Sequence, residues 1–279
     1  MDKDKLKSAN NTYRTATLAN AVVYNSEFTR GYVNGAPHVK HESLRKLYAK
    51  LAIGVYDYAR KFVITPKVLD LGAGEGSTTL QFLELGAEVT AVDNSKSQLV
   101  SLENKCEPFK GRLKVYSQDV EAFLSRKNHG SYDIVVVSSF LHHIPDYLEL
   151  IKKIIALLPP HGQFFAFQDP LRYDSVGKFT KIFSDVSYFS WRIFQGDVIK
   201  GIKRRMRRGR GIYLQDCESD NAEYHVARNG VDQNAIFELF KKEHFDCRII
   251  PYFSTQSSLF QPVGNFLRIK NTFAVIARR

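Results

Sequence analysis

The chain has 279 residues, of which 44% are hydrophobic, and its 40 Lys and Arg against 29 Asp and Glu give a formal charge of +11. This composition is typical of a globular protein that buries a core without disulfides, and the three dispersed cysteines include no CxxC pair for zinc or a redox couple. The polar first residues and the lack of a long apolar run lead us to expect no signal peptide, no transmembrane helix and a cytoplasmic setting.

The positive charge is unevenly distributed along the chain. Residues 67–170 carry 10 basic and 13 acidic side chains, so the surplus belongs to the segments before and after them. The densest cluster runs from Lys203 to Arg210, where six of eight residues are basic. Such a cluster is typical of a surface that binds phosphate, anionic membrane or nucleic acid, although it is equally typical of a solvated helix or loop.

The predicted elements begin with helices in the first 66 residues, above all over 42–62. From residue 67 to residue 170, short apolar runs alternate with amphipathic stretches, which is the pattern of a parallel sheet covered by helices on both faces. We predict strands over 67–71, 88–92, 112–116, 132–138 and 163–167, and helices over 77–85, 95–104, 119–126 and 146–158.

The pattern becomes irregular after Pro170. Aromatic and basic residues crowd the stretch from 173 to 228, which is too long for a loop and is therefore expected to be an inserted helical cap. A helix over 231–243 and strands over 245–252 and 271–277, joined by a long hairpin connection, complete the pattern. We predict an N-terminal helical lid (1–66), a core (67–170 and 231–279) and a basic cap insertion (171–230).

A glycine-rich turn, residues 72–76, follows the first strand, with Asp70 two residues ahead of its first glycine. Such a turn lets a ligand approach the backbone closely, and the helix that follows offers free N–H groups. The spacing matches neither the G-x-G-x-x-G dinucleotide fingerprint nor the G-x-x-x-x-G-K-[ST] phosphate loop. An acid at Asp70 also disfavours a pyrophosphate, so the turn favours a cationic ligand without phosphate.

At this turn the sequence resembles the class I S-adenosylmethionine-dependent methyltransferases, whose first motif is D/E-x-G-x-G-x-G. The resemblance covers residues 67–170 well and the last helix and strands more loosely. It implies an α/β fold: a Rossmann-like doubly wound sheet of seven strands, the last antiparallel, with N-terminal helices and a helical cap insertion after strand five. It also implies S-adenosyl-L-methionine as cofactor, bound by Asp70, Gly72, Ala73, Gly74, Gly76, Asp93, Asn94, Gln118, Asp119, Val120 and Ser138.

The resemblance also assigns parts of the cofactor to these residues. Asp93 would hold the two ribose hydroxyls, Gln118 and Asp119 would contact the adenine, and Asp70 with the glycine turn would hold the methionine end. Each acid has a purely structural alternative as a helix cap or a strand terminator, and the glycines have one as a tight turn.

Candidate catalytic residues follow strands four and five. Small-molecule methyltransferases of this class commonly have a stretch similar to Leu141-His142-His143, in which one histidine is usually structural and the other faces the pocket. We favour His143 for the pocket, with the alternative that both are structural. Asp169 is a candidate for orienting the acceptor or assisting His143, unless it only starts a turn. The catalytic candidates are His143, His142 and Asp169.

Candidate substrate-binding residues come from the segment before the sheet and from the cap. Aromatic and histidine side chains on a lid suit a small acceptor. The histidines lack the carboxylate neighbours expected of a metal site, so no metal is predicted. The substrate candidates are Tyr24, Phe28, His38, His41 and Arg192.

The absence of other motifs narrows the predicted reaction. The sequence contains no D/N-P-P-Y/F tetrapeptide and no cysteine placed for attack on cytosine, and no RNA-binding module accompanies the basic cluster. We predict methyl transfer to a hydroxyl or amine of a small or saccharide-like acceptor, with or without phosphate, and at most peripheral contact with an anionic surface through Lys203 to Arg210. An RNA methyltransferase and a non-catalytic cofactor-binding regulatory subunit are the alternatives. The acceptor and the oligomeric state stay open.

Overall fold

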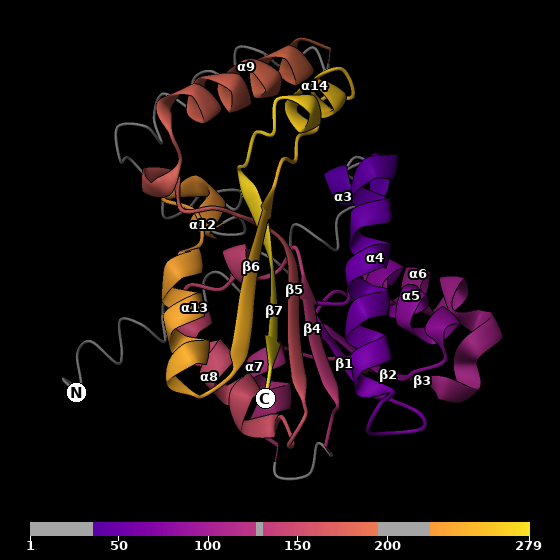
Figure 1. The fold of residues 1–279 in the computed structure, drawn as a ribbon. Coiled ribbons are helices and arrows are strands. Elements are labelled where there is room, and N and C mark those ends of the chain that lie inside the picture. Colours follow the sequence, from indigo (N-terminus) through magenta and orange to yellow (C-terminus); the bar gives the residue numbers. More distant parts are fainter. Residues whose placement is uncertain (1–35, 127–130, 195–223) are drawn as a thin grey trace, which may run out of the picture.

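Figure 1 shows the computed structural model, which describes residues 36–126, 131–194 and 224–279. Its seven-stranded sheet has the order β3-β2-β1-β4-β5-β7-β6, and β7 runs antiparallel to both of its neighbours. This topology confirms the predicted Rossmann-like fold with an antiparallel last strand. The strands are β1 (Lys67–Leu71), β2 (Glu88–Asp93), β3 (Leu113–Ser117), β4 (Ile134–Ser138), β5 (Gln163–Pro170), β6 (Asp246–Tyr252) and β7 (Thr272–Arg278).

Helices cover both faces of the sheet, and each face has its own apolar core. Along β4, Val135 and Val137 point into one core, whereas Ile134 and Val136 point into the other. A central parallel strand buried on both faces is continuously apolar, as the sequence of β4 is. The first core is closed by α7 (Val120–Leu124), α8 (Tyr147–Leu157) and α13 (Gln233–Lys242), and the second by α4 (Glu42–Ala59), α5 (Ser77–Leu85) and α6 (Lys96–Lys105).

Local signals account for most helix boundaries. Gly86 ends α5 in the left-handed conformation with φ of 106°, and Asp232 caps α13 by accepting hydrogen bonds from the N–H groups of Asn234 and Ala235. At the start of α5, neither Ser77 nor Thr78, both residue types that commonly cap helices, is the N-cap. Gly76 takes the cap position there, with no side-chain hydrogen bond.

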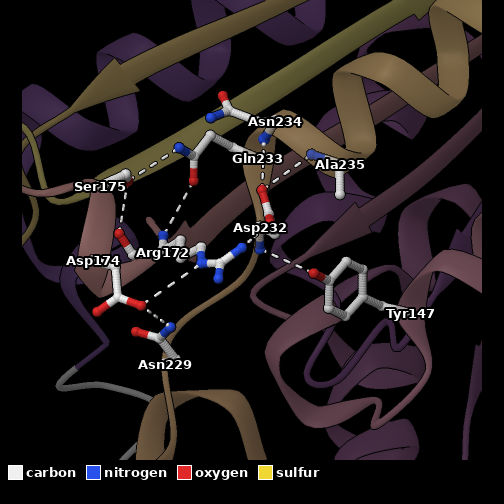
Figure 2. Close-up of polar contacts among 9 residues, drawn as sticks. All are labelled: Tyr147, Arg172, Asp174, Ser175, Asn229, Asp232, Gln233, Asn234 and Ala235. Carbon is white, nitrogen blue, oxygen red and sulfur yellow. Dashed lines mark hydrogen bonds and ion pairs between the residues drawn. The ribbon is translucent and has the colours of Figure 1, made fainter.

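The two ends of the predicted cap insertion meet at the carboxyl end of β5. Val231 donates its N–H to the carbonyl of Pro170 (3.0 Å). Figure 2 shows the polar network around this junction, in which Arg172 forms an ion pair with Asp232 and its N–H donates to Gln233 Oε1 (3.1 Å). The chain therefore leaves and rejoins the core at nearly one point. The described part of the insertion contains η3 (Tyr173–Ser175), α9 (Lys178–Phe194) and α12 (Tyr224–Ala227).

A helix missing from the sequence prediction, α14 (Phe260–Phe266), lies within the expected hairpin connection between β6 and β7. It lies close to α9 at one end of the molecule (Figure 1). The basic cluster from Lys203 to Arg210 lies outside the described residues. Among the helices of the described ranges, none is both long and apolar enough to cross a bilayer. The remaining elements are α3 (Pro37–Lys40), η1 (Glu107–Arg112) and η2 (Leu141–His143).

Candidate functional site

A pocket lies at the carboxyl ends of β1, β2 and β4, where the order of the parallel strands reverses direction. Such a switch point is the usual ligand site of doubly wound sheets. The pocket is walled by the turn after β1, the ends of β2 and β4, the segments after β3 and β4, and the segment around α3. Its lining residues are Ala36, His38, Val39, Gly72, Ala73, Gly74, Glu75, Ser77, Thr78, Asp93, Asn94, Gln98, Asp119, Val120, Ser138, Ser139, Phe140, His143 and Ile144.

Two glycines of the turn are required by its backbone and surroundings. Gly72 has φ of 71°, and a Cβ there would lie 2.2 Å from Phe140 Cδ2. Gly74 has φ of 53°, and a Cβ there would meet no atom within 4 Å. The turn thus packs against Phe140 on one side and leaves the backbone at Gly74 open toward the pocket, as close approach of a ligand requires.

The carboxylate of Asp93 fixes the turn from the neighbouring strand. One oxygen accepts the N–H of Gly74 (2.9 Å) and the other accepts the N–H of Ser95 (2.8 Å). Burial raises the pKa of Asp93, while these backbone donors oppose the rise. Because each carboxylate oxygen has about two acceptor positions, the group keeps acceptor capacity for a ligand in the pocket.

Asp70 lies beneath the turn and does not line the pocket. Its side chain is 1% exposed, and Oδ2 accepts a hydrogen bond from the Thr79 hydroxyl (2.7 Å). Oδ1 has no hydrogen-bond partner within the described ranges. Burial, with a smaller contribution from Asp93, raises the pKa of Asp70 to about 7. The structure therefore places this acid as a support of the turn and of α5.

The other cofactor candidates divide into two groups. Asn94, Asp119, Val120 and Ser138 line the pocket together with Ala73, and Asp119 also caps α7 by accepting the N–H of Ala122 (3.1 Å). Gln118 and Gly76 are outside its wall. Gln118 Oε1 accepts a hydrogen bond from Arg126, and a Cβ on Gly76 would lie 2.7 Å from Leu102 Cγ, so both are engaged in packing around the pocket.

The two adjacent histidines after β4 have different environments. His143 lines the pocket, whereas His142 is paired with Asp169 behind it: Asp169 Oδ1 lies 2.8 Å from His142 Nδ1 and accepts the His142 backbone N–H at 3.0 Å. Asp169 is fully buried. The carboxylate therefore orients His142, which differs from the expectation that it assists His143 or faces the acceptor.

Of the substrate candidates, only His38 lines the pocket within the part of the chain that the structure describes. Burial and the nearby His142 lower the pKa of His38 to about 4, so its ring is uncharged at neutral pH. His41 Nε2 instead contacts the carbonyl of Thr255 (2.7 Å), and Arg192 donates from Nε to the Tyr188 hydroxyl (3.0 Å) on α9. Tyr24 and Phe28 lie outside the described residues.

Several wall residues were not among the sequence candidates. Phe140 and Ser139 follow β4 directly. The glycine at position 72, against which the Phe140 ring packs, is the one local signal for this bulky neighbour. Ser139 has φ of 53° and donates its N–H to the carbonyl of Phe167 (2.7 Å), a conformation that sequence reasoning did not reveal. Val39 and Ala36 enter from α3, far away in sequence, and Gln98, Glu75, Ser77, Thr78 and Ile144 complete the set.

The sheet order, with a pocket at its switch point, defines a Rossmann-like fold. Residues 68–162, about a third of the chain, match the family model described as a methyltransferase domain. This match confirms the family resemblance inferred from the glycine turn.

Relatives of known name match part of the chain. Over 98 residues the chain is 34% identical to a ubiquinone biosynthesis O-methyltransferase of Coxiella burnetii, covering 35% of this chain and 41% of that protein. Over 104 residues it is 35% identical to the enzyme of the same name from Vibrio campbellii, covering 37% and 43% of the two chains. The match thus spans less than half of the length of these relatives.

Solved methyltransferase structures resemble the whole chain in fold. The plantazolicin methyltransferase BpumL, in complex with SAH, aligns with a TM-score of 0.54 at 15% identity over 98% of each chain. The magnesium protoporphyrin IX methyltransferase ChlM of Synechocystis PCC 6803, with bound SAM, aligns with a TM-score of 0.52 at 15% identity over 95% of this chain and 97% of that one. At this identity the likeness establishes the fold.

Proposed function

We propose that the protein is an S-adenosylmethionine-dependent methyltransferase that methylates a hydroxyl group of a small acceptor. The observation that carries the proposal is the pocket at the switch point, where the open glycine turn, Asp93 and His143 line one cavity. The methyltransferase domain match and the solved relatives with bound SAM or SAH support the same cofactor.

The residues of the pocket fit this cofactor. Gly74 leaves open space where a side chain would otherwise stand, and the hydroxyl oxygen of Ser138 is buried without a hydrogen-bond partner in the described residues. In our proposal the turn receives the methionine end, Asp93 accepts hydrogen bonds from the ribose hydroxyls, and Asp119 and Val120 border the adenine. Residues 67–170, which form the turn and most of the pocket wall, carry 10 basic and 13 acidic side chains, and this negative surplus suits a sulfonium cation.

The bound cofactor supplies an electrophilic methyl carbon, and the protein's tasks are to align the acceptor oxygen with it, exclude water and remove the acceptor's proton. We assign the last task to His143, because it faces the pocket while its neighbour His142 is held by Asp169. An unprotonated ring nitrogen of His143 would take the proton of the acceptor hydroxyl. As the carbon–oxygen bond forms, the bond between the methyl carbon and the cofactor's sulfur would break, leaving S-adenosylhomocysteine.

Selection of the acceptor falls to the segment ahead of the sheet in this proposal. His38 and Val39 of α3, with Ala36 just before it, complete the pocket wall, which supports a lid role for the segment around α3, whereas α4 belongs to the core of the sheet. The uncharged ring of His38 suits a neutral hydroxylated acceptor better than an anion. The relatives named O-methyltransferases support a hydroxyl over an amine.

Calorimetric titration with S-adenosylhomocysteine tests the cofactor assignment. Asp93→Ala is expected to weaken binding by roughly tenfold to a hundredfold, because a hydrogen-bonding carboxylate is lost. Asp93→Asn keeps the shape of the side chain and separates loss of charge from distortion of the turn. Asp57→Ala, an exposed acid on α4, is the matched control. Unchanged affinity in both Asp93 variants would refute the assignment.

Turnover tests the reaction. Formation of S-adenosylhomocysteine from S-adenosylmethionine is followed with catechols as hydroxyl probes and with primary amines as amine probes. We expect product with catechols only. Turnover of amines alone would contradict hydroxyl methylation while leaving the cofactor assignment intact.

A further inference from the structure

Exposed apolar side chains are concentrated at one end of the molecule. Of the twelve large apolar side chains that are exposed within the described ranges, eight belong to α9, to α14 or to the residues adjoining α14. An apolar patch of this extent is unusual for a surface that faces only water, because scattered single residues are the normal case. The patch consists of Phe179, Ile182, Val186, Ile193, Leu259, Val263, Phe266 and Leu267.

On α9 the exposed apolar residues form one stripe. Phe179, Ile182 and Val186 are spaced by three and four residues, so they lie on one face of the helix, and each is at least half exposed (63%, 63% and 50%). The face that carries Ser184 and Ser187 holds the helix to the protein: Asn271 Nδ2 donates to the Ser184 hydroxyl (3.3 Å), the Ser187 hydroxyl bonds to Thr255, and Ser187 is fully buried. The stripe therefore points away from the protein.

The second stripe is formed by α14 and its flanks. Phe266 is 86% exposed and Leu259 is 65% exposed, while Gly264 packs its backbone against Phe253 on the inner side. An edge-to-face contact between Phe183 of α9 and Phe260 of α14, with ring centroids 5.6 Å apart, joins the two helices. Figure 1 shows both helices beyond the ends of β6 and β7, at one end of the described chain.

Basic side chains border the apolar patch. Lys178 and Lys181 lie on α9, and Arg268 and Lys270 follow α14; all four are exposed and form no ion pair with another described residue. Apolar side chains bordered by Lys and Arg are the pattern of a surface that inserts into the headgroup region of an anionic membrane.

We infer that the apolar patch of α9 and α14 docks the protein onto an anionic phospholipid bilayer, with the four cations in contact with the headgroups. A second copy of the chain fits the patch less well, since the pairing of two identical faces would bring these cations together. The docking surface is independent of the proposed chemistry, because none of its residues lines the pocket.

The docking surface is nevertheless tied to the pocket wall. Lys40 Nζ donates to the carbonyl of Gln256 (2.9 Å), and Asn265 of α14 donates to the Ser43 hydroxyl (3.2 Å). These contacts connect α14 and the loop before it with the start of α4 and with α3, the helix that carries His38. A bilayer bound at α14 would therefore lie at the same end of the molecule as α3, which forms part of the pocket wall.

Co-sedimentation of the full chain with vesicles tests the inference. Vesicles of phosphatidylglycerol and phosphatidylcholine in equal parts are expected to bind the protein roughly tenfold more tightly than phosphatidylcholine alone, and added salt should weaken this binding. Phe266→Ser combined with Leu259→Ser should weaken it by roughly tenfold. The matched control is Ile64→Ser, since Ile64 is also 86% exposed but lies between α4 and β1.

Loss of vesicle binding in the double variant but not in the control, with the free energy of unfolding in urea unchanged, would support the inference. It would show that the apolar patch contributes to binding in addition to any basic charge elsewhere in the chain. Absence of binding to both vesicle types, or equal loss in the control, would overturn the inference. So would a dimer in equilibrium sedimentation that Phe266→Ser dissociates while vesicles bind nothing, because the patch would then be an interface between copies.

Discussion

Replacing Asp70 by asparagine removes a carboxyl group whose protonation the fold controls. Burial raises the pKa of Asp70 from 3.8 to about 7, so the folded protein holds this proton over a range in which the unfolded chain has released it. Stability is therefore fully present below about pH 4 and falls as the pH rises toward 7. The shift of roughly three units corresponds to about 4 kcal/mol in the free energy of unfolding at 1.36 kcal/mol per unit.

The side chain of asparagine does not titrate and can still accept the Thr79 hydrogen bond, so the Asp70→Asn variant lacks this pH dependence. Urea denaturation of both proteins without ligand, at pH 5, 6, 7 and 8, measures the difference. We expect the variant to gain about 1.4 kcal/mol per pH unit relative to the wild type up to pH 7, and little beyond. Asp57→Asn on the surface of α4 should show no such trend. A difference in the free energy of unfolding between Asp70→Asn and the wild type that stays the same from pH 5 to pH 8 would refute the raised pKa of Asp70.

Two further substitutions probe the base and the junction of the insertion. His143→Ala is expected to lower turnover of a catechol by roughly a hundredfold or more while S-adenosylhomocysteine affinity changes little; equal losses in both would show that His143 binds and does not take the proton. Asp232→Ala removes the cap of α13 and the partner of Arg172, and it should lower the free energy of unfolding by about 1–2 kcal/mol in urea titrations. Asp246→Ala, an exposed acid on β6, serves as its control, and equal stability of the two variants would contradict the capping role.

The parts of the fold that follow from local chemistry could be predicted. Apolar runs the length of a strand, Gly86 at a helix end and Asp232 at a helix start are signals within a few residues, and the strands and helices of 67–170 follow them closely. The turn at Gly72 and Gly74 and the acid at Asp93 likewise lie at fixed places relative to strand ends, so their meeting at one pocket follows from the parallel sheet.

Features that depend on contacts far apart in sequence could not be predicted. Asp169 pairs with His142 across 27 residues, and no local pattern distinguishes this partner from His143. The short helix α14 carries the helix-breaking residues Pro262 and Gly264, so its sequence favours a loop. It is stabilised by packing against Phe253 and Phe183, which only the fold brings to it.

The sheet has two parts that carry different features of the molecule. The order β3-β2-β1-β4 carries the glycine turn and Asp93, whereas β5-β7-β6 carries α9, α14 and their connections. Because β7 is antiparallel to both β5 and β6, β6 runs in the same direction as β5, and the loop that follows β6 lies at the same edge of the sheet as the pocket. Substitutions on the outer side of α14 that keep the contacts of this loop with Lys40, His41 and Ser43 would change the surface of the protein and leave the glycine turn in place. The exposed end of the molecule and the pocket can therefore vary in sequence separately.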